Sequence, residues 1–297
     1  MEAHMKKYQP SLLAEDFIFL EAPRWHDNRL WISDVFDHAV YALDLNGTRQ
    51  KVCVVPHRPS GLGFLPDGTP IVVSSKDRRL MKIDGQSIVE YADLSAMAAG
   101  DLNDFAVDAQ GRIYVGNFGY DYDAGEPRAL TSLHRVDRDG TIKIAARGLE
   151  FPNGSVIVND GKTLIVAETW LGRLTAFDID GQGELGNRRL YADLGAREPD
   201  GICADAAGAI WVACFNTGEF LRVLDGGSIT DIIAFDGRAI SCTLGGADGR
   251  QLFCSVYRGN DNELSERIRK GAILTVEVDV PAPCSSAVRV HSVPSAA

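Results

Sequence analysis

The sequence predicts an all-β fold, a six-bladed β-propeller, and three observations support this prediction. The chain has 297 residues, of which 45% are apolar and 24% charged, enough to build a large packed core. Amphipathic helix periodicity is almost absent, and only residues 93–99 and 262–270 could form short helical turns. A unit of strand, hairpin turn and two further strands recurs six times, which is typical of propeller blades. Two stacked β-sandwiches are the alternative, and the regular recurrence favours the propeller.

Each of the six units begins with an apolar strand that ends at a hairpin turn. The turn residues are Asn28, Gly68, Gly111, Gly161, Gly208 and Gly249, which lie 40, 43, 50, 47 and 41 residues apart. Asp-Gly, Gln-Gly and Asp-Asn pairs favour such turns because these residues accept positive φ angles. In chain order, the strands of the successive units are predicted at 22–28, 30–33 and 39–44; 61–68, 70–74 and 79–84; 104–111, 113–116 and 132–137; 154–161, 163–167 and 173–178; 201–208, 210–213 and 220–225; 242–249, 251–255 and 272–279. The chain 1–297 is then a single propeller domain, with residues 1–11 expected to be a tail and partly a cloning scar.

The charge and the cysteine content restrict the partners and the compartment. The chain carries 30 Lys and Arg residues against 41 Asp and Glu residues, a formal net charge of −11. An acidic surface repels phosphate backbones and anionic lipids, so we expect neither nucleic acid nor membrane partners. No signal or transmembrane segment and no C-x-x-C pair is found, so we expect a cytoplasmic protein with reduced thiols. We expect a small-molecule partner, and a monomer or weak homo-oligomer.

One position of the repeat collects short polar side chains. It lies eight residues before the turn glycine in five units, and Glu21 lies seven residues before Asn28 in the first unit. The six residues at this position are Glu21, Ser60, Asn103, Asn153, Asp200 and Ser241. Because the first strand of each propeller blade lines the central channel, we expect these side chains to form a ring around the axis.

The chemistry of this ring predicts a metal site on the central axis. Glu21 and Asp200 supply carboxylates, while Asn103 and Asn153 supply amide oxygens. Such an all-oxygen, partly anionic set suits a hard divalent cation. Without a cation the two carboxylates would repel each other, and one of them would take up a proton. The alternatives are a channel that holds only water against a polar ring, and single Asn, Asp and Ser residues that serve as ordinary turn residues.

Five short motifs contain most of these ring residues. They are Leu20-Glu21-Ala22-Pro23-Arg24-Trp25, Leu102-Asn103-Asp104 (followed by Val107-Asp108 and Gly111-Arg112), Phe151-Pro152-Asn153-Gly154, Glu198-Pro199-Asp200-Gly201 and Cys242-Thr243-Leu244-Gly245-Gly246. Their order and separations resemble those of the gluconolactonase/regucalcin (senescence marker protein, luciferin-regenerating) family. The resemblance covers roughly residues 12–280.

The resemblance implies a six-bladed propeller that holds one divalent cation on its axis and opens the lactone ring of a sugar acid or similar small molecule. It makes Glu21, Asn153 and Asp200 the metal ligands, and Asp200 also the catalytic acid or base. Asn103 would be a ligand or near-ligand that also touches substrate. Ca²⁺ is the expected cation, with Mg²⁺, Mn²⁺, Zn²⁺ or Fe²⁺ as alternatives, and Glu21 is the alternative base.

The mouth of the expected channel departs from the family pattern. Sugar lactonases often have Arg where this chain has Asp101, and a substrate-binding Glu of the family corresponds most nearly to Asp121. The longest non-repetitive segment, residues 118–129, could fold over the mouth, which Trp170 could also line. The residues expected to contact substrate are Asn103, Asp101, Asp121, Tyr120 and Trp170. This mixture would suit a polyhydroxy or partly apolar neutral lactone better than an anionic one.

Other kinds of chemistry find little support. The sequence has no H-E-x-x-H, G-x-S-x-G or P-loop motif. The histidines at positions 26, 38, 57, 134 and 291 are scattered and expected to be structural, although His57 could reach the mouth. Two alternatives to a lactonase remain: a metal-dependent esterase or organophosphate hydrolase that uses the same site, and a non-catalytic metal-binding propeller.

Overall fold

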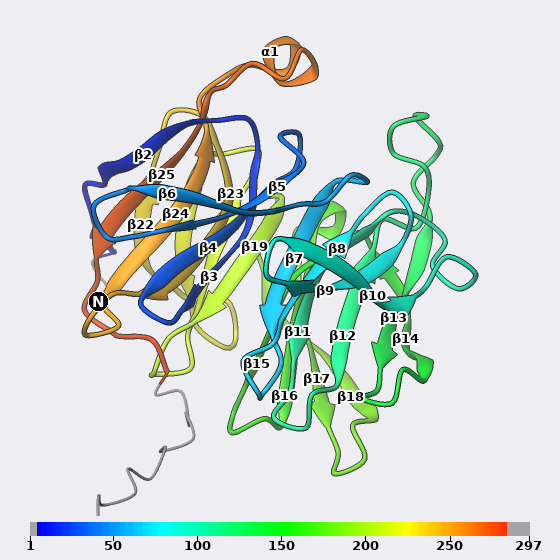
Figure 1. The fold of residues 1–297 in the computed structure, drawn as a ribbon. Coiled ribbons are helices and arrows are strands. Elements are labelled where there is room, and N and C mark those ends of the chain that lie inside the picture. Colours follow the sequence, from blue (N-terminus) through cyan, green and yellow to red (C-terminus); the bar gives the residue numbers. More distant parts are fainter. Residues whose placement is uncertain (1–4, 284–297) are drawn as a thin grey trace, which may run out of the picture.

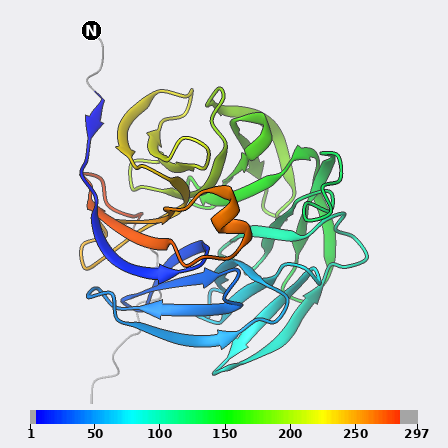
Figure 2. The same ribbon diagram turned by 90° about the horizontal axis from the view of Figure 1, so that it is seen from above.

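Residues 5–283, which this computed structural model describes, form six sheets arranged in a ring around a central axis (Figure 2). Five sheets have four strands and one has five, and successive strands within each blade pair antiparallel. The predicted six-bladed β-propeller is therefore confirmed.

The six blades follow the chain order (Figure 1). The first three consist of β3 (Leu20–His26), β4 (Arg29–Asp34), β5 (Ala39–Leu43) and β6 (Arg49–Val54); β7 (Pro59–Phe64), β8 (Pro70–Ser74), β9 (Arg79–Asp84) and β10 (Ser87–Asp93); β11 (Leu102–Val107), β12 (Ile113–Asn117), β13 (Leu130–Val136) and β14 (Ile142–Glu150). The last three consist of β15 (Pro152–Val158), β16 (Thr163–Glu168), β17 (Arg173–Ile179) and β18 (Leu185–Asp193); β19 (Pro199–Ala204), β20 (Ile210–Cys214), β21 (Glu219–Val223) and β22 (Ile229–Ala234); β23 (Arg238–Gly245), β24 (Gln251–Tyr257) and β25 (Gly271–Glu277), completed by β2 (Ser11–Phe17).

The N-terminal segment closes the ring. Strand β2 pairs antiparallel with β25, so the outer strand of the sixth blade comes from the beginning of the chain. Strand β1 (Lys6–Lys7) adds to the fifth blade by pairing parallel with β22. The Tyr8 hydroxyl donates a hydrogen bond to Asp231 at 3.0 Å, and the Tyr8 ring packs edge-on against Trp211. The expectation that residues 1–11 are a tail is therefore wrong for residues 6–8, which are fixed on the fifth blade, and for Ser11, which begins β2.

The first hairpin explains why Glu21 is one residue closer to its turn than the other ring members. Asp27 and Asn28 have φ angles of 47° and 58°, and the adjoining residues His26 and Arg29 are already paired. Two consecutive residues at positive φ make the tight hairpin that Asn favours. In the second blade the hairpin is longer, because pairing begins only at Phe64 and Pro70.

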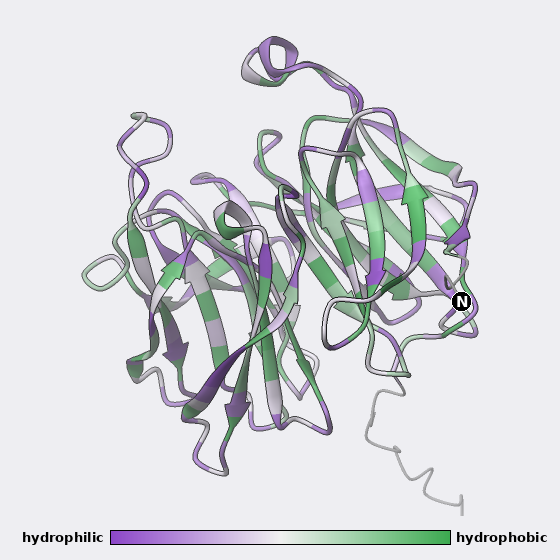
Figure 3. Ribbon diagram, turned by 180° about the vertical axis from the view of Figure 1, so that it is seen from behind, coloured by the Kyte–Doolittle hydropathy of each residue, from purple (hydrophilic) through white to green (hydrophobic). Residues whose placement is uncertain are grey.

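The core lies between neighbouring blades. Leu174 and Ile165 of the fourth blade, for example, belong to the same buried cluster as Val212 and Leu221 of the fifth. Figure 3 shows apolar residues concentrated along the strands and hydrophilic ones in the connecting loops. Each sheet thus buries both faces against its neighbours, which holds the inner strands in fixed positions around the axis.

Helix is confined to short segments of the described chain. These are the 3₁₀ turn η1 (Thr169–Leu171) and the helix α1 (Asp261–Ser265), which overlaps the predicted 262–270 region. Residues 95–97 form a single turn, in which the N–H of Ala98 donates to the carbonyl oxygen of Leu94 at 2.9 Å, in line with the short helical turn expected at 93–99. Nowhere in residues 5–283 is there a helix long and apolar enough to cross a membrane.

Candidate functional site

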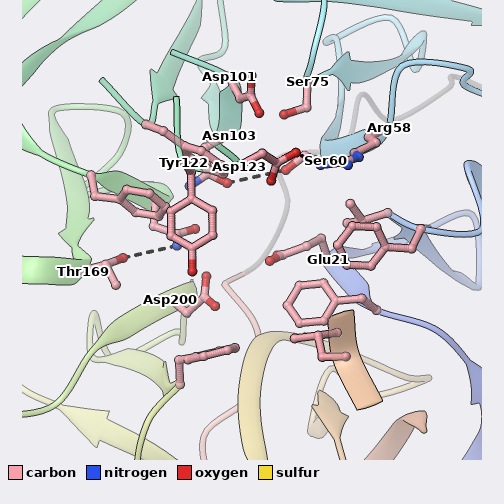
Figure 4. Close-up of a pocket in the computed structure, with 18 of the residues that line it drawn as sticks. Glu21, Arg58, Ser60, Ser75, Asp101, Asn103, Tyr122, Asp123, Thr169 and Asp200 are labelled. Atoms are coloured by element: carbon pink, nitrogen blue, oxygen red, sulfur yellow. Dashed lines mark hydrogen bonds and ion pairs between the residues drawn. The ribbon is translucent and has the colours of Figure 1, made fainter. Parts of the chain in front are cut away.

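A cavity of about 200 Å³ lies on the axis, at the end where the inner strands of the blades begin. Figure 4 shows that the side chains of Glu21, Asn103 and Asp200 converge on a common space within it. These residues come from β3, β11 and β19, and Asn153 of β15 and Ser60 of β7 line the same cavity. Five of the six residues predicted from the repeat therefore lie together.

β-Bulges in the inner strands aim these side chains at the axis. In four blades the register with the neighbouring strand shifts at the ring residue, across 59–62, 102–105, 152–155 and 199–202. In the first blade the shift begins at Glu21, and the next residue, Ala22, has a strained φ of 48°. A bulge re-aims the side chains that it contains. The five polar residues that line this end of the cavity, which we call the polar floor, are thus placed by the same local irregularity in successive blades. They are Glu21, Ser60, Asn103, Asn153 and Asp200.

Ser241, the sixth expected ring member, does not line the cavity. It is buried against Gly201, where an added Cβ would lie 1.8 Å from the Ser241 Oγ. The register shift of β23 lies between Ala239 and Ser241 and contains one residue, whereas each of the four described above contains two. The expectation for Ser241 is therefore wrong, because alternation along β23 turns its side chain toward the neighbouring strand.

Two carboxyl groups on the cavity floor are electrostatically unfavourable together. Burial raises the pKa of Glu21 well above its usual range, and the negative charges of Asp200 and Asp104 raise it further. Burial likewise raises the pKa of Asp200 well above its usual range; the side chain of Asn153 opposes this shift, and the negative charges of Asp104 and Glu198 add to it. Asp104 is itself paired with Arg24 at 2.7 Å. The floor therefore has an excess of negative charge that a cation would relieve.

The two asparagine amides are oriented by neighbouring groups. Asn153 donates from Nδ2 to the Thr169 hydroxyl at 3.2 Å, and that hydroxyl donates to the carbonyl oxygen of Pro199 at 2.8 Å. Asn103 donates from Nδ2 to the carbonyl oxygen of Pro152 at 3.3 Å. Because Nδ2 of Asn153 is used by Thr169, its carbonyl oxygen is left for a partner in the cavity.

Two oxygens on the floor are buried without a partner among the described residues. They are Oδ1 of Asn153 and Oδ1 of Asp200, whose side chains are 5% exposed. Buried oxygens of this kind are costly unless a ligand satisfies them. Across residues 5–283 no three His, Cys, Asp or Glu side chains form a metal-binding group, so a metal here would depend on asparagine oxygens. An all-oxygen set fits a hard cation such as Ca²⁺ better than a soft one.

The residues expected at the mouth lie partly elsewhere. Asp101 and Trp170 line the cavity, but Tyr120 and Asp121 do not, whereas the next two residues, Tyr122 and Asp123, do. The hydroxyl of Tyr120 accepts a hydrogen bond from Trp170 Nε1 at 2.9 Å, beneath the cavity wall. Asp121 instead accepts from the backbone N–H of Ala124 within its own loop. The expectation that Tyr120 and Asp121 contact the substrate directly is therefore wrong. The tyrosine and the aspartate that line the cavity are Tyr122 and Asp123, two residues further along the chain.

Charged residues from the second and third blades form a network at the mouth. Lys76 lies 2.8 Å from Asp101 and 3.4 Å from Asp123, and Arg58 lies 2.7 Å from the same Asp123. Burial raises the pKa of Asp101, while Lys76 opposes this shift. Burial also acts on Asp123, but Arg58 and Lys76 bring its pKa below the usual value. His57, two residues before the inner strand β7, is exposed and does not line the cavity.

Most of the cavity residues that the sequence did not indicate follow the second strand of a blade; they are Val35, Phe36, Ser75, Phe118, Thr169 and Phe215. Leu264 reaches the cavity from the corresponding, longer loop of the sixth blade. Phe19, Arg58 and Phe151 line the cavity from positions just before an inner strand. The position after the second strand of each repeat unit is the sequence signal for the first set, as it is for Trp170.

Comparison with known proteins adds a sequence family and related folds. Residues 19–258 match the family described as SMP-30/Gluconolactonase/LRE-like region. Regucalcin from Danio rerio is 30% identical over 74% of this chain and 73% of its own length. A 6-deoxy-6-sulfogluconolactonase from Pseudomonas putida is 26% identical over 92% of this chain and 94% of its own.

Solved structures of similar proteins share the fold. Regucalcin from Agrobacterium tumefaciens, described as a calcium-binding protein, gives a TM-score of 0.80 at 21% identity, covering 93% of this chain and 96% of its own. A gluconolactonase from Xanthomonas campestris gives a TM-score of 0.74 at 21% identity, covering 92% of this chain and 90% of its own.

Proposed function

This chain belongs to the SMP-30/gluconolactonase/LRE-like family, and from that premise we propose that it is a divalent-cation-dependent lactonase. Its reaction would be hydrolysis of a cyclic ester of a sugar acid or similar small molecule. One observation carries the proposal: the Oδ1 atoms of Asn153 and Asp200, which have no hydrogen-bond partner within residues 5–283, lie with Glu21 on the floor of a cavity that can hold a small molecule.

Glu21, Asn153 and Asp200 would hold the cation, with Asn103 beside them. Their donors are all oxygens and include two carboxylates, which favours Ca²⁺ and also admits Mg²⁺ or Mn²⁺. When bound, a divalent cation supplies positive charge that polarises a carbonyl group and lowers the pKa of water.

The chain's own groups can provide the proton transfers of ester hydrolysis. Water adds to the lactone carbonyl, the ring C–O bond breaks, and the leaving alkoxide must receive a proton. Asp200 is the proposed group that removes a proton from the attacking water and returns it to the alkoxide, with Glu21 as the alternative. Asn103 retains one N–H beyond the one bonded to Pro152, and this N–H can donate to an oxygen of the substrate.

The relatives support this reading in their own right. One is named as a lactonase of a sulfonated sugar acid and one solved neighbour as a gluconolactonase. Two others are named regucalcin, one of them described as calcium-binding. These names are consistent with a lactonase that uses a divalent cation.

The test is a substrate panel on protein stripped of metal by chelation and then reconstituted separately with Ca²⁺, Mg²⁺, Mn²⁺, Zn²⁺ or Fe²⁺. Hydrolysis of lactones, an aryl ester and a phosphotriester is measured by acid release at constant pH. We expect lactone hydrolysis to disappear on chelation and to return with at least one cation. Full activity after chelation would contradict the metal-dependent mechanism, and activity on the phosphotriester or aryl ester alone would replace the lactonase by a related hydrolase.

A further inference from the structure

We propose that the substrate carries an aromatic-sized apolar group beside its lactone ring, held between two groups of aromatic side chains in the cavity wall. The inference rests on the proposed lactonase function and adds the class of substrate. Seven aromatic residues line the cavity, and they form two groups that come from different blades.

The first aromatic group consists of Phe19, Phe36 and Phe215. Phe19 precedes β3, while the other two follow the second strands of the first and fifth blades. The Phe19 ring centroid lies 6.0 Å from that of Phe36 and 6.5 Å from that of Phe215. Val35 and Leu264 extend this apolar surface along the wall.

The second aromatic group consists of Phe118, Tyr122, Phe151 and Trp170, from the third and fourth blades. Phe118 stacks on Phe151 with a centroid separation of 4.3 Å, and Trp170 lies 4.9 Å from Phe151. Tyr122 lies 6.2 Å from Phe151 and remains 52% exposed. Tyr122 and Asp200 line the same cavity (Figure 4). Covering the exposed Tyr122 ring with an apolar group of the substrate would remove apolar surface from water and so favour binding.

The cavity is large enough for such a group. Its volume of about 200 Å³ exceeds the roughly 150 Å³ that admits benzene in an engineered protein cavity. With the lactone carbonyl on the polar floor, an attached substituent must pass along one or both aromatic walls.

A polyhydroxylated substrate would be matched less well. Each buried hydroxyl requires a hydrogen-bond partner, and the walls offer rings instead. The charged groups at the mouth pair with one another, Asp101 with Lys76 and Asp123 with Arg58, so a sugar hydroxyl would have to compete with these ion pairs. Asp101, which accepts from Lys76, brings a carboxylate and not a free cation to this part of the mouth.

The experiment compares five-membered lactones that differ only in their substituents: γ-butyrolactone, γ-valerolactone, γ-phenyl-γ-butyrolactone and D-galactono-1,4-lactone. We expect kcat/KM for the phenyl compound to exceed that for γ-butyrolactone and for the galactonolactone by about 10- to 100-fold, the range expected for burying a ring. Trp170→Ala and Phe36→Ala, one variant for each aromatic group, should remove most of this advantage while affecting γ-butyrolactone much less. Trp170→Phe should retain it.

Phe64→Ala is the matched control. Phe64 ends β7 at the opposite end from Ser60 and stacks on His26 outside the cavity, so the preference among lactones should not change. Calorimetric titration with 5-phenyl-2-pyrrolidinone and with 2-pyrrolidinone, lactams that resist hydrolysis, measures recognition of the ring without turnover. We expect at least about tenfold tighter binding of the phenyl compound, by the same burial.

The outcomes separate the inference from the proposed function. Equal or faster hydrolysis of the galactonolactone would overturn the inference and leave a lactonase in place. If the reconstituted enzyme hydrolyses no lactone, the proposed function fails. The lactam titration then tests whether the cavity binds an aromatic ring. Tenfold tighter binding of the phenyl lactam would support ring binding, and equal affinity for the two lactams would overturn it.

Discussion

The ammonium group of Lys76 lies 2.8 Å from the carboxylate of Asp101, in a contact that joins the second and third blades at the cavity mouth. The Asp101 side chain is 13% exposed and that of Lys76 is 30% exposed. Such a pair is neither fully buried nor freely solvated, so its contribution to stability is modest, while loss of one partner leaves the other poorly solvated.

Replacing Lys76 by Met should destabilise the fold and shift the titration of Asp101. Burial already raises the pKa of Asp101, and Lys76 opposes this, so in Lys76→Met the pKa rises further. A carboxyl group whose pKa is raised in the folded state destabilises the fold at any pH where it must ionise. We therefore expect Lys76→Met to lower the free energy of unfolding by about 1 kcal/mol near neutral pH, and by less in acid, where Asp101 is protonated. Denaturant unfolding at two pH values measures it. Lys82→Met, at an exposed position on the same blade, is the control, and an equal loss in both variants would contradict the assignment.

Asp123 anchors the 118–129 loop to the second blade. It accepts from Arg58 at 2.7 Å and lies 3.4 Å from Lys76. In Asp123→Asn the loop loses charge attraction, and ordering it around substrate then costs more free energy. For a partly exposed pair we expect KM to rise up to about fivefold with little change in kcat, and high salt to reproduce part of the effect in the wild type.

Asp225→Asn is the control for this substitution, because Asp225 forms an exposed pair with Arg189 at 2.7 Å away from the cavity. Its KM should equal that of the wild type. If Asp123→Asn changes kcat alone, or if both variants behave alike, the loop is not held by this contact in the way described.

His134 should make the protein less stable in mild acid. Burial lowers its pKa, and the positive charge of Arg147 adds to this effect. As pH falls below the usual histidine value near 6.5, the unfolded chain takes up a proton that the folded protein resists, so stability decreases over that interval. In His134→Phe the drop in Tm between about pH 8 and about pH 5.5 should be smaller than in the wild type. An unchanged drop would show that His134 does not contribute.

The contact of Tyr8 with the fifth blade should stabilise the ring. Its ring packs on Trp211 and its hydroxyl bonds to Asp231. Tyr8→Ala should lower the free energy of unfolding by about 1 to 2 kcal/mol, and Tyr8→Phe, which loses only the hydrogen bond, by about 0.5 to 1 kcal/mol. Denaturant unfolding measures both. Wild-type stability in Tyr8→Ala would mean that this segment is a tail in solution.

The blades could be predicted from the sequence because each is a local meander with its own turn signals. The strand β2 could not, since its partner β25 lies more than 250 residues further along the chain and no local pattern links them. Tyr8 and β1 were missed for the same reason. The two ends of the chain pair because the ring of blades must close, and the repeating pattern within each blade carries no information about that pairing.

The polar floor was predictable because the bulge recurs at a fixed distance from the hairpin in successive blades. Ser241 failed this rule, since the bulge of β23 is one residue shorter and reverses the direction of the side chain. Tyr120 and Asp121 were placed two residues too early because the internal turn of their loop, tied by Asp121 to Ala124, has no counterpart in the repeat.

Glu21, Asn153 and Asp200 are proposed to hold a divalent cation, and calorimetric titration of Ca²⁺ into the metal-stripped protein tests this without relying on turnover. The wild type should bind one cation per chain, Asp200→Ala should bind at least about tenfold more weakly because a charged oxygen ligand is lost, and Asp123→Asn at the mouth should bind like the wild type. Binding of Ca²⁺ to Asp200→Ala with wild-type affinity would show that these residues do not hold the cation.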